Sequence, residues 1–222
     1  MTADLRSLIQ AAPIQGEGLH ERAIAAALAL TEVQPDRCPD LDQVAQALSA
    51  DRDELAARFT DGQAVLLAAV EQALLWLMDA CTRAVVKVDP KDPVAQFVAL
   101  GVAYVDWAAR FRQQFLMISN GRLVDIRRHP DLARYAAAVH DLMRRMLQRA
   151  RDDGRVHADE DLEMMMLSSR IFIYGLARRL IEGRIESQSG EPLDRCTAHR
   201  VLRDFVTRYS CSAHPACRNR HG

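Results

Sequence analysis

The chain has 222 residues, of which 49% are hydrophobic, 27% are charged and 5% are aromatic. This length accommodates one large domain, or a small domain joined to a medium one, and the apolar fraction is sufficient for a sizeable core. A formal net charge of −1 indicates neither a nucleic acid nor a membrane as partner, and five scattered cysteines predict a reduced, cytoplasmic protein rather than a disulfide framework.

Helical periodicity runs through the whole chain, and no segment alternates as a strand does, so the predicted fold class is all-α. A first helix is expected over residues 19–33, and Pro35 ends it. Asp40 and Asp51 are suited to cap two short helices, because a carboxylate accepts from the free N–H groups of a first turn. A long fourth helix is expected over residues 61–86.

Two prolines within residues 88–93 mark the clearest break in the chain, and longer helical stretches follow it. These stretches cover residues 94–118, which are expected to be bent or broken, and then 130–152, 159–183 and 192–209. We therefore predict a small three-helix domain at 17–66, joined by a long connector helix to a larger helical-bundle domain at 67–210, and a flexible tail at 211–222.

Several short motifs in this helix order resemble the TetR family of transcriptional regulators. In the first domain they are Arg22-Ala-Ile-Ala-Ala-Ala-Leu28, Asp40-Leu-Asp-Gln-Val-Ala45, and the pair Leu55 and Phe59. In the second domain they are Tyr104-Val-Asp-Trp-Ala108 with Phe115-Leu-Met117, and the turn Gly154-Arg-Val156. The resemblance implies a helix-turn-helix domain whose third helix enters the major groove of operator DNA, and a helical domain that binds a ligand.

The resemblance places six residues at the DNA, namely Gln43, Ser49, Ala50, Arg52, Asp53 and Arg58. Arg52 and Arg58 are the only cations of the recognition helix, where arginine can read guanine or contact phosphate. Members of this family usually have glycine where Ser49 stands and a phosphate-binding lysine where Gly62 stands. Restoring the family's chemistry with Gly62→Lys and Asp53→Ser is therefore expected to strengthen DNA binding.

The charge of the first domain favours the alternative that DNA binding is weakened or lost. Residues 17–66 include four basic and ten acidic residues, which leaves this segment at −6. Because affinity for DNA depends heavily on neutralising phosphates, a negative face opposes binding. The alternative is a TetR-like protein whose DNA binding is weakened or lost, and which acts through protein or small-molecule binding.

The second domain carries aromatic and methionine side chains at helical spacing. The candidate ligand-binding residues are Trp107, Phe111, Phe115, His140, Met143 and Phe172. A helical bundle with large apolar groups and few polar ones suits a small apolar or amphipathic ligand. The same helical spacing of apolar side chains is also typical of a solid core. For His140, the alternative is a structural role in which its ring is hydrogen-bonded.

The last two long helices contain more apolar residues than one bundle face buries. This excess predicts a homodimer through a four-helix seam, with internal packing as the alternative. The expected interface residues are Ile171, Gly175, Arg179, Val201 and Phe205. Gly175 would allow the two helices to approach closely.

No enzyme activity, cofactor or metal is expected, and no membrane partner. The sequence has no glycine-rich phosphate loop and no nucleophile elbow, and its apolar runs are interrupted by charges before they are long enough to cross a membrane. At the C-terminus, Cys211, His214, Cys217 and His221 are residue types that suit zinc. Their spacing is tight and no partner loop is present, so a flexible tail is the favoured interpretation.

Overall fold

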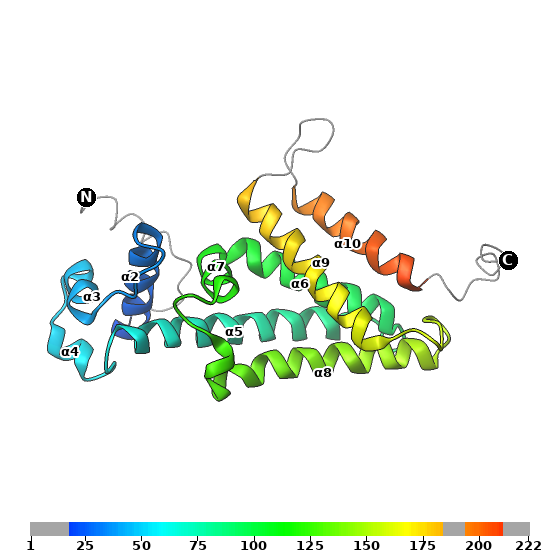
Figure 1. Cartoon of the computed structure of the whole chain (residues 1–222), viewed down its shortest axis with the longest axis horizontal. Coiled ribbons are helices and arrows are strands. Elements are labelled where there is room, and N and C mark those ends of the chain that lie inside the picture. The colour runs from blue at the N-terminus through cyan, green and yellow to red at the C-terminus, as the bar shows by residue number, and fades with distance from the viewer. Residues whose placement is uncertain (1–17, 184–193, 211–222) are drawn as a thin grey trace. The chain divides into compact units, whose positions relative to one another are not determined.

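The computed structural model describes residues 18–183 and 194–210 (Figure 1). Within these ranges the chain forms nine α-helices, one 3-10 helix and no strand, which confirms the all-α prediction. The first four helices are α2 (Leu19–Val33), α3 (Leu41–Leu48), α4 (Arg52–Ala56) and α5 (Gly62–Val86). The others are α6 (Pro93–Arg110), α7 (Arg112–Asn120), η1 (Ile126–Arg128), α8 (Pro130–Asp152), α9 (Leu162–Glu182) and α10 (Arg195–Ser210).

The helices divide into two compact units that interleave along the chain. The first unit contains the described residues up to Leu75 together with Arg110–Ala133, and so holds α2, α3, α4 and α7. The second contains Trp76–Ala109 and the described residues from Arg134 onward, which include α9 and α10. Helices α5 and α8 contribute residues to both units.

Local backbone signals fix where the later helices begin and end. The predicted break within residues 94–118 is confirmed at Phe111, whose φ of −114° and ψ of 54° are not helical. Asp161 caps α9, because its carboxylate accepts hydrogen bonds from the backbone N–H groups of Glu163 at 2.9 Å and Met164 at 3.2 Å. The expected start of this helix was therefore about one turn early.

The first unit is built on the apolar face of α2, where every residue from Ala23 to Ala29 is buried. Helix α3 begins with a capping box: the Gln43 N–H donates to Asp40 Oδ1 at 2.8 Å, and the Asp40 N–H donates to Gln43 Oε1 at 3.0 Å. Two backbone donors that the first turn would leave free are thus satisfied. The predicted cap at Asp40 is confirmed.

The first turn of α5 lies against the loop before α3 through Gly62, which is buried. A Cβ atom at this position would overlap the carbonyl oxygen of Pro39 and lie 2.8 Å from its carbonyl carbon. A lysine therefore cannot be placed here without moving the Pro39 backbone. The packing of the helix-turn-helix unit thus opposes Gly62→Lys, so Asp53→Ser is the change that tests whether the family's chemistry strengthens DNA binding.

Gly62→Ala is expected to lower the free energy of unfolding by about 1–3 kcal/mol, because a methyl group is forced into occupied space. Chemical denaturation followed by circular dichroism measures this change. Gln46→Ala, exposed on α3 of the same unit, is the control and should change stability by less than about 0.5 kcal/mol. Equal stability of the Gly62→Ala variant and the parent would mean that the Pro39 loop yields without cost.

The second unit has a close crossing of α6 with α10. A Cβ at Gly101 would lie 2.9 Å from Leu202 Cδ2, so glycine sets the separation of these two helices. About one turn before Leu202 in α10, His199 Nε2 lies 2.9 Å from Asp106 Oδ1 of α6. Apolar side chains of α6, α8 and α9 are buried in the second unit, among them Phe97, Met146 and Met166.

Helix α5 is long and apolar enough, by length and composition alone, to cross a membrane. In the most apolar 18-residue window of this helix, 44% of the residues are buried inside the protein. A core helix of a helical protein meets the same criterion, so this feature by itself says little about a membrane.

Candidate functional site

Helices α3 and α4 and the turn between them form the candidate DNA-binding element. Ser49 ends α3 with a φ of 52° and a ψ of 40°, in the left-handed region that favours glycine. Asp51 then caps α4 by accepting a hydrogen bond from the Asp53 N–H at 2.7 Å. The sharp turn and the cap together set the direction of the five-residue α4 relative to α3.

Ser49→Gly is expected to raise the free energy of unfolding by about 1 kcal/mol, because it removes the steric penalty of a left-handed Cβ. Gln46→Gly, one turn earlier in right-handed helix, is the matched control and should lower stability by about 0.5–1 kcal/mol. Thermal unfolding of the two variants tests the sign. A loss of stability in Ser49→Gly would contradict the strain assigned to this turn.

Arg52 is paired within the helix-turn-helix itself. Its Nε donates to Asp42 Oδ1 of α3 at 2.7 Å, and the two side chains are 55% and 73% exposed. An ion pair this exposed contributes at most about 1 kcal/mol to stability, so it favours this orientation of Arg52 but does not fix it. Asp42 did not stand out in the sequence as a functional residue, because ten positions and a turn separate it from Arg52.

The other candidate DNA residues have different environments. Arg58 and Asp53 are exposed, and no ion pair to either is found in the described part of the chain. Gln43 is half-buried, and its side-chain oxygen is used in the capping box. Ala50 donates its backbone N–H to Ala45 at 3.1 Å, so its contribution at this turn is structural.

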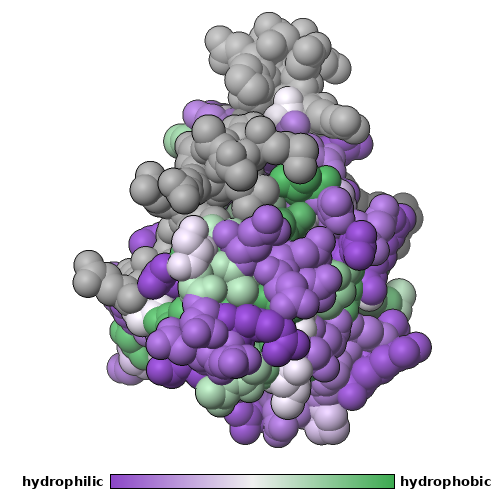
Figure 2. Space-filling view, turned by 90° about the vertical axis from the view of Figure 1, so that its left-hand side faces the viewer, coloured by the Kyte–Doolittle hydropathy of each residue, from purple (hydrophilic) through white to green (hydrophobic). Residues whose placement is uncertain are grey.

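The surface around α3 and α4 is mostly hydrophilic, as Figure 2 shows in a view onto the left-hand side of Figure 1. The exposed carboxylates on it are those of Asp42, Asp51, Asp53, Glu54 and Asp61. Against them stand the guanidinium groups of Arg52 and Arg58. The acidic character predicted from composition is therefore exposed to solvent on α3, α4 and the adjoining turns, and is not buried in the core.

Interactions that the sequence did not reveal join the helix-turn-helix to the α7–η1 segment within the first unit. Arg122 Nη1 lies 2.5 Å from Asp36 Oδ1, and Gln63 Nε2 donates to the Leu123 carbonyl at 3.0 Å. Asp36 and Arg122 are 86 positions apart, so no local pattern indicates their contact. Residues 110–133 contain five arginines and two aspartates, a net charge of +3 that partly offsets the acidic helices.

The candidate ligand-binding residues are mostly buried. Trp107 is 4% exposed, Phe115 1% and Met143 7%. Phe172 of α9 stacks on Phe205 of α10, with ring centroids 4.0 Å apart and planes inclined by 4°. The structure thus brings together one residue predicted for the ligand and one predicted for the dimer. Whether a ligand reaches these residues stays a prediction.

His140 lies among charged groups of α8 and α9. Its Nε2 is 3.7 Å from Glu163 Oε2 and 3.5 Å from Arg144 Nη2, and Arg144 itself pairs with Glu163. These contacts fit the structural alternative for His140 better than an apolar cavity wall.

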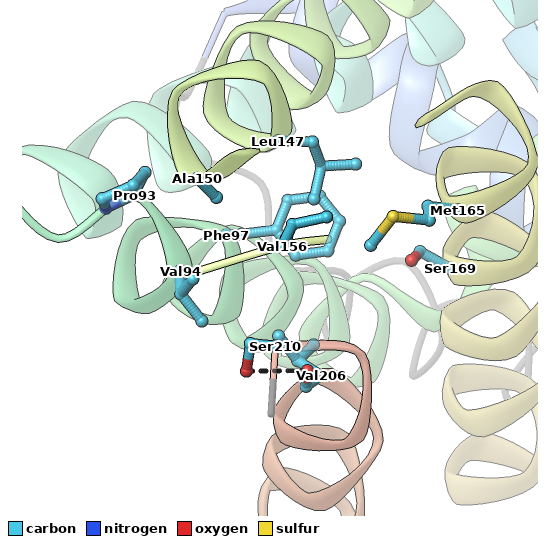
Figure 3. Close-up of a pocket in the computed structure, with 10 residues that line it drawn as sticks. All are labelled: Pro93, Val94, Phe97, Leu147, Ala150, Val156, Met165, Ser169, Val206 and Ser210. Carbon is cyan, nitrogen blue, oxygen red and sulfur yellow. Dashed lines mark hydrogen bonds between the residues drawn. The ribbon is translucent and has the colours of Figure 1, made fainter. Parts of the chain in front are cut away.

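A small cavity of about 20 Å³ lies elsewhere in the second unit. Figure 3 shows its walls: Phe97 from α6, Leu147 from α8, Met165 and Ser169 from α9, and Val206 and Ser210 from α10. This space admits one water-sized group. None of the six candidate ligand residues lines it.

The candidate dimer face on α9 is exposed and apolar. Met164, Leu167 and Ile171 are 55%, 47% and 63% exposed, and they follow one another at three- and four-residue intervals. Gly175 continues the row, with open space where a Cβ would be. On α10, Val201 is 40% exposed. Arg179 is also exposed, at the end of the same α9 face.

No group of three or more metal-binding side chains occurs in residues 18–183 and 194–210. The four Cys and His residues of the C-terminal pattern lie outside the described residues. Within them, burial raises the pKa of the Cys81 thiol to about 12. Cys81 therefore stays protonated and acts as a small apolar core residue rather than a nucleophile.

Comparison with solved structures identifies the fold. A protein of unknown function from Rhodococcus sp. RHA1 shares 23% identity, with 88% of this chain and 97% of that chain covered and a TM-score of 0.69. PfmR, a TetR family transcriptional regulator from Thermus thermophilus, shares 17% identity, with 84% and 97% covered and a TM-score of 0.67. The ketosteroid transcriptional regulator KstR2 of Mycobacterium tuberculosis shares 15%, with 89% and 96% covered and a TM-score of 0.66.

No protein-family model matches the chain, and no curated protein matches it. The identities to the solved structures are low, so the likeness is one of fold. The chain has the fold of the TetR-type transcriptional regulators, as its helix order and short motifs indicated.

Proposed function

We propose that this chain, which has the TetR-type fold, is a ligand-responsive transcriptional regulator that binds operator DNA as a homodimer, most simply as a repressor. The observation that carries the proposal is the α3–turn–α4 element. It has a capped first helix, a left-handed turn at Ser49 and a capped second helix that presents Arg52 to solvent, while Arg58, expected on the same helix, is exposed in the turn after it. This is the geometry by which a helix-turn-helix enters the major groove.

The exposed row on α9 supports the homodimer. Two copies that pack α9 and α10 against each other would cover Leu167 and Ile171, which a single chain leaves in water. A two-fold dimer would hold two recognition helices about one helical turn of DNA apart, as paired half-sites require.

Ligand response rests on the apolar interior of the helical domain and on the likeness to regulators named for lipid-like molecules, such as the ketosteroid regulator KstR2. A small apolar or amphipathic molecule in this interior would shift the balance between a DNA-competent and an incompetent arrangement of the recognition helices. The residues proposed to contact it are those of the predicted set that lie buried or half-buried in the second unit, namely Trp107, Met143 and Phe172.

The acidic surface of α3 and α4 favours a second candidate function. This segment exposes five carboxylates and two arginines, and one of the arginines already has an acidic partner in Asp42. A protein of this fold with weak or absent DNA binding would act through protein or small-molecule contacts instead.

A gel-shift experiment with the promoter region beside the encoding gene separates the two functions. At low salt, a specific shift is expected for the parent chain and a stronger one for Asp53→Ser, which removes a negative charge from the recognition helix. The double variant Arg52→Ala, Arg58→Ala is the control and should show none. Absence of any shift for the parent and for Asp53→Ser would exclude the repressor function and favour the second candidate, a protein of this fold that acts without binding DNA.

A further inference from the structure

Arg122, in the loop between α7 and η1, contacts the helix-turn-helix domain from outside it. Its Nη1 lies 2.5 Å from Oδ1 of Asp36, in the loop between α2 and α3. The adjoining Leu123 carbonyl accepts a hydrogen bond at 3.0 Å from Nε2 of Gln63, in the first turn of α5. Residues 122–123 therefore lie against both the loop that leads into α3 and the beginning of α5.

The beginnings of α3 and α5 are themselves in contact at this place. The carbonyl oxygen of Pro39, the residue before the α3 cap, fills the space where a Cβ of Gly62 would lie. These residues and Arg122 all belong to the first compact unit, which also holds α4. A guanidinium group that is remote in the sequence is thus added to the helix-turn-helix beside the start of α3.

The Arg122–Asp36 pair does little to stabilise the fold. The two side chains are 72% and 71% exposed, and an ion pair so open to water contributes little to stability. Arg127 and Arg128 pair differently, with Asp125 of their own segment. What the contact with Asp36 does achieve is to hold one exposed positive charge next to the α2–α3 loop.

The start of α3 is also the place where a helix-turn-helix meets the DNA backbone, because its first helix crosses the backbone while the second enters the major groove. Helix α3 is the first of the two here, so phosphates pass close to it when α4 lies in the groove. The caps of α3 and α5 are the carboxylates of Asp40 and Asp61, which repel phosphate. A cation beside the start of α3 offsets these charges, and a phosphate contact of this kind fixes the position of a protein on DNA without reading its sequence.

We propose that Arg122 binds a phosphate of the DNA backbone, and that Asp36 is its partner in the free protein. The DNA-binding surface then extends beyond residues 17–66 to the α7–η1 loop, and this extension rests on the proposed function. Binding exchanges an exposed carboxylate for a phosphate, to which a guanidinium donates charge-assisted hydrogen bonds. Because Asp36 competes with the phosphate, the contact is weaker than that of an arginine without an acidic neighbour.

The contact is tested by fluorescence anisotropy with two labelled duplexes of equal length, one from the promoter region beside the encoding gene and one of scrambled sequence. Arg122→Ala is expected to weaken binding to both duplexes by about three- to tenfold, and to lower the salt slope by about one for each bound chain. Arg122→Lys keeps the charge and should keep the slope of the parent.

Two control variants separate a phosphate contact from a structural role. Asp36→Asn breaks the same ion pair but leaves Arg122, so it should bind DNA as tightly as the parent or up to about threefold more tightly. A purely structural role predicts that Asp36→Asn and Arg122→Ala both weaken binding. Arg83→Ala removes the same charge from an exposed arginine that pairs with Asp79 about six turns further along α5, and should leave the slope unchanged.

The failure of this contact and the failure of the proposed regulator give different results. A parent slope in Arg122→Ala, or equal weakening in Asp36→Asn, overturns the phosphate contact, while a parent that prefers the promoter duplex keeps the regulator. A parent that binds both duplexes equally contradicts the regulator, and the slope of Arg122→Ala still decides the contact. A parent that binds neither duplex at low salt overturns both.

Discussion

The double substitution Leu167→Asp, Ile171→Asp is expected to convert the dimer into a monomer. Both side chains are exposed in a single chain and lie four residues apart on α9, beside the open space at Gly175. In a two-fold interface each carboxylate occurs twice, so four charges would be buried without partners. Dimer affinity should fall by at least about a hundredfold, which light scattering at micromolar concentration detects as a halved mass.

The design avoids Phe205, because that ring stacks on Phe172 of the same chain and its loss would disturb the fold. The control is Val33→Asp, Val86→Asp, which places the same charges at exposed apolar positions outside α9 and α10. This control should stay dimeric. A persistent dimer in Leu167→Asp, Ile171→Asp would place the interface on another surface, or exclude these two residues from it.

Arg52→Ala is expected to weaken operator binding by about 1–3 kcal/mol and to relax specificity at one base pair of each half-site. Arg52 is the cation that α4 itself contains, and Arg58 lies in the turn after the helix, so few other groups can replace Arg52. The opposite change, Asp42→Asn, frees the guanidinium from its acidic partner and removes a negative charge from the face. It should strengthen binding by up to about 1 kcal/mol.

Fluorescence anisotropy with labelled operator, titrated at several salt concentrations, measures both effects. Arg58→Ala serves as the comparison: it should weaken all sequences alike and lower the salt slope by about one if it contacts phosphate. Unchanged affinity in Arg52→Ala, or weaker binding in Asp42→Asn, would show that Arg52 does not face the groove as proposed.

The helices themselves were largely determined by local sequence. Asp40 and Asp51 cap the two short helices as expected, because a capping carboxylate needs only the next three residues to find its donors. The left-handed turn at Ser49 falls where the family resemblance implies glycine. A break within residues 94–118 and the order of the α-helices follow from periodicity, which each segment carries within its own residues, whereas the position of the break at Phe111 and the 3-10 helix η1 do not.

The tertiary structure alone decided which distant residues meet. The requirement for glycine at Gly62 depends on how α5 approaches the Pro39 carbonyl, and this distance is set by the packing of whole helices. The same is true of the Arg52–Asp42 and Arg122–Asp36 pairs, whose members lie on different elements. Sequence periodicity specifies which face of a helix is apolar, but the angle and separation at which two faces pack arise only from their combined side-chain shapes. For that reason the helix-turn-helix was predictable from the chain, and the cavity beside α10 was not.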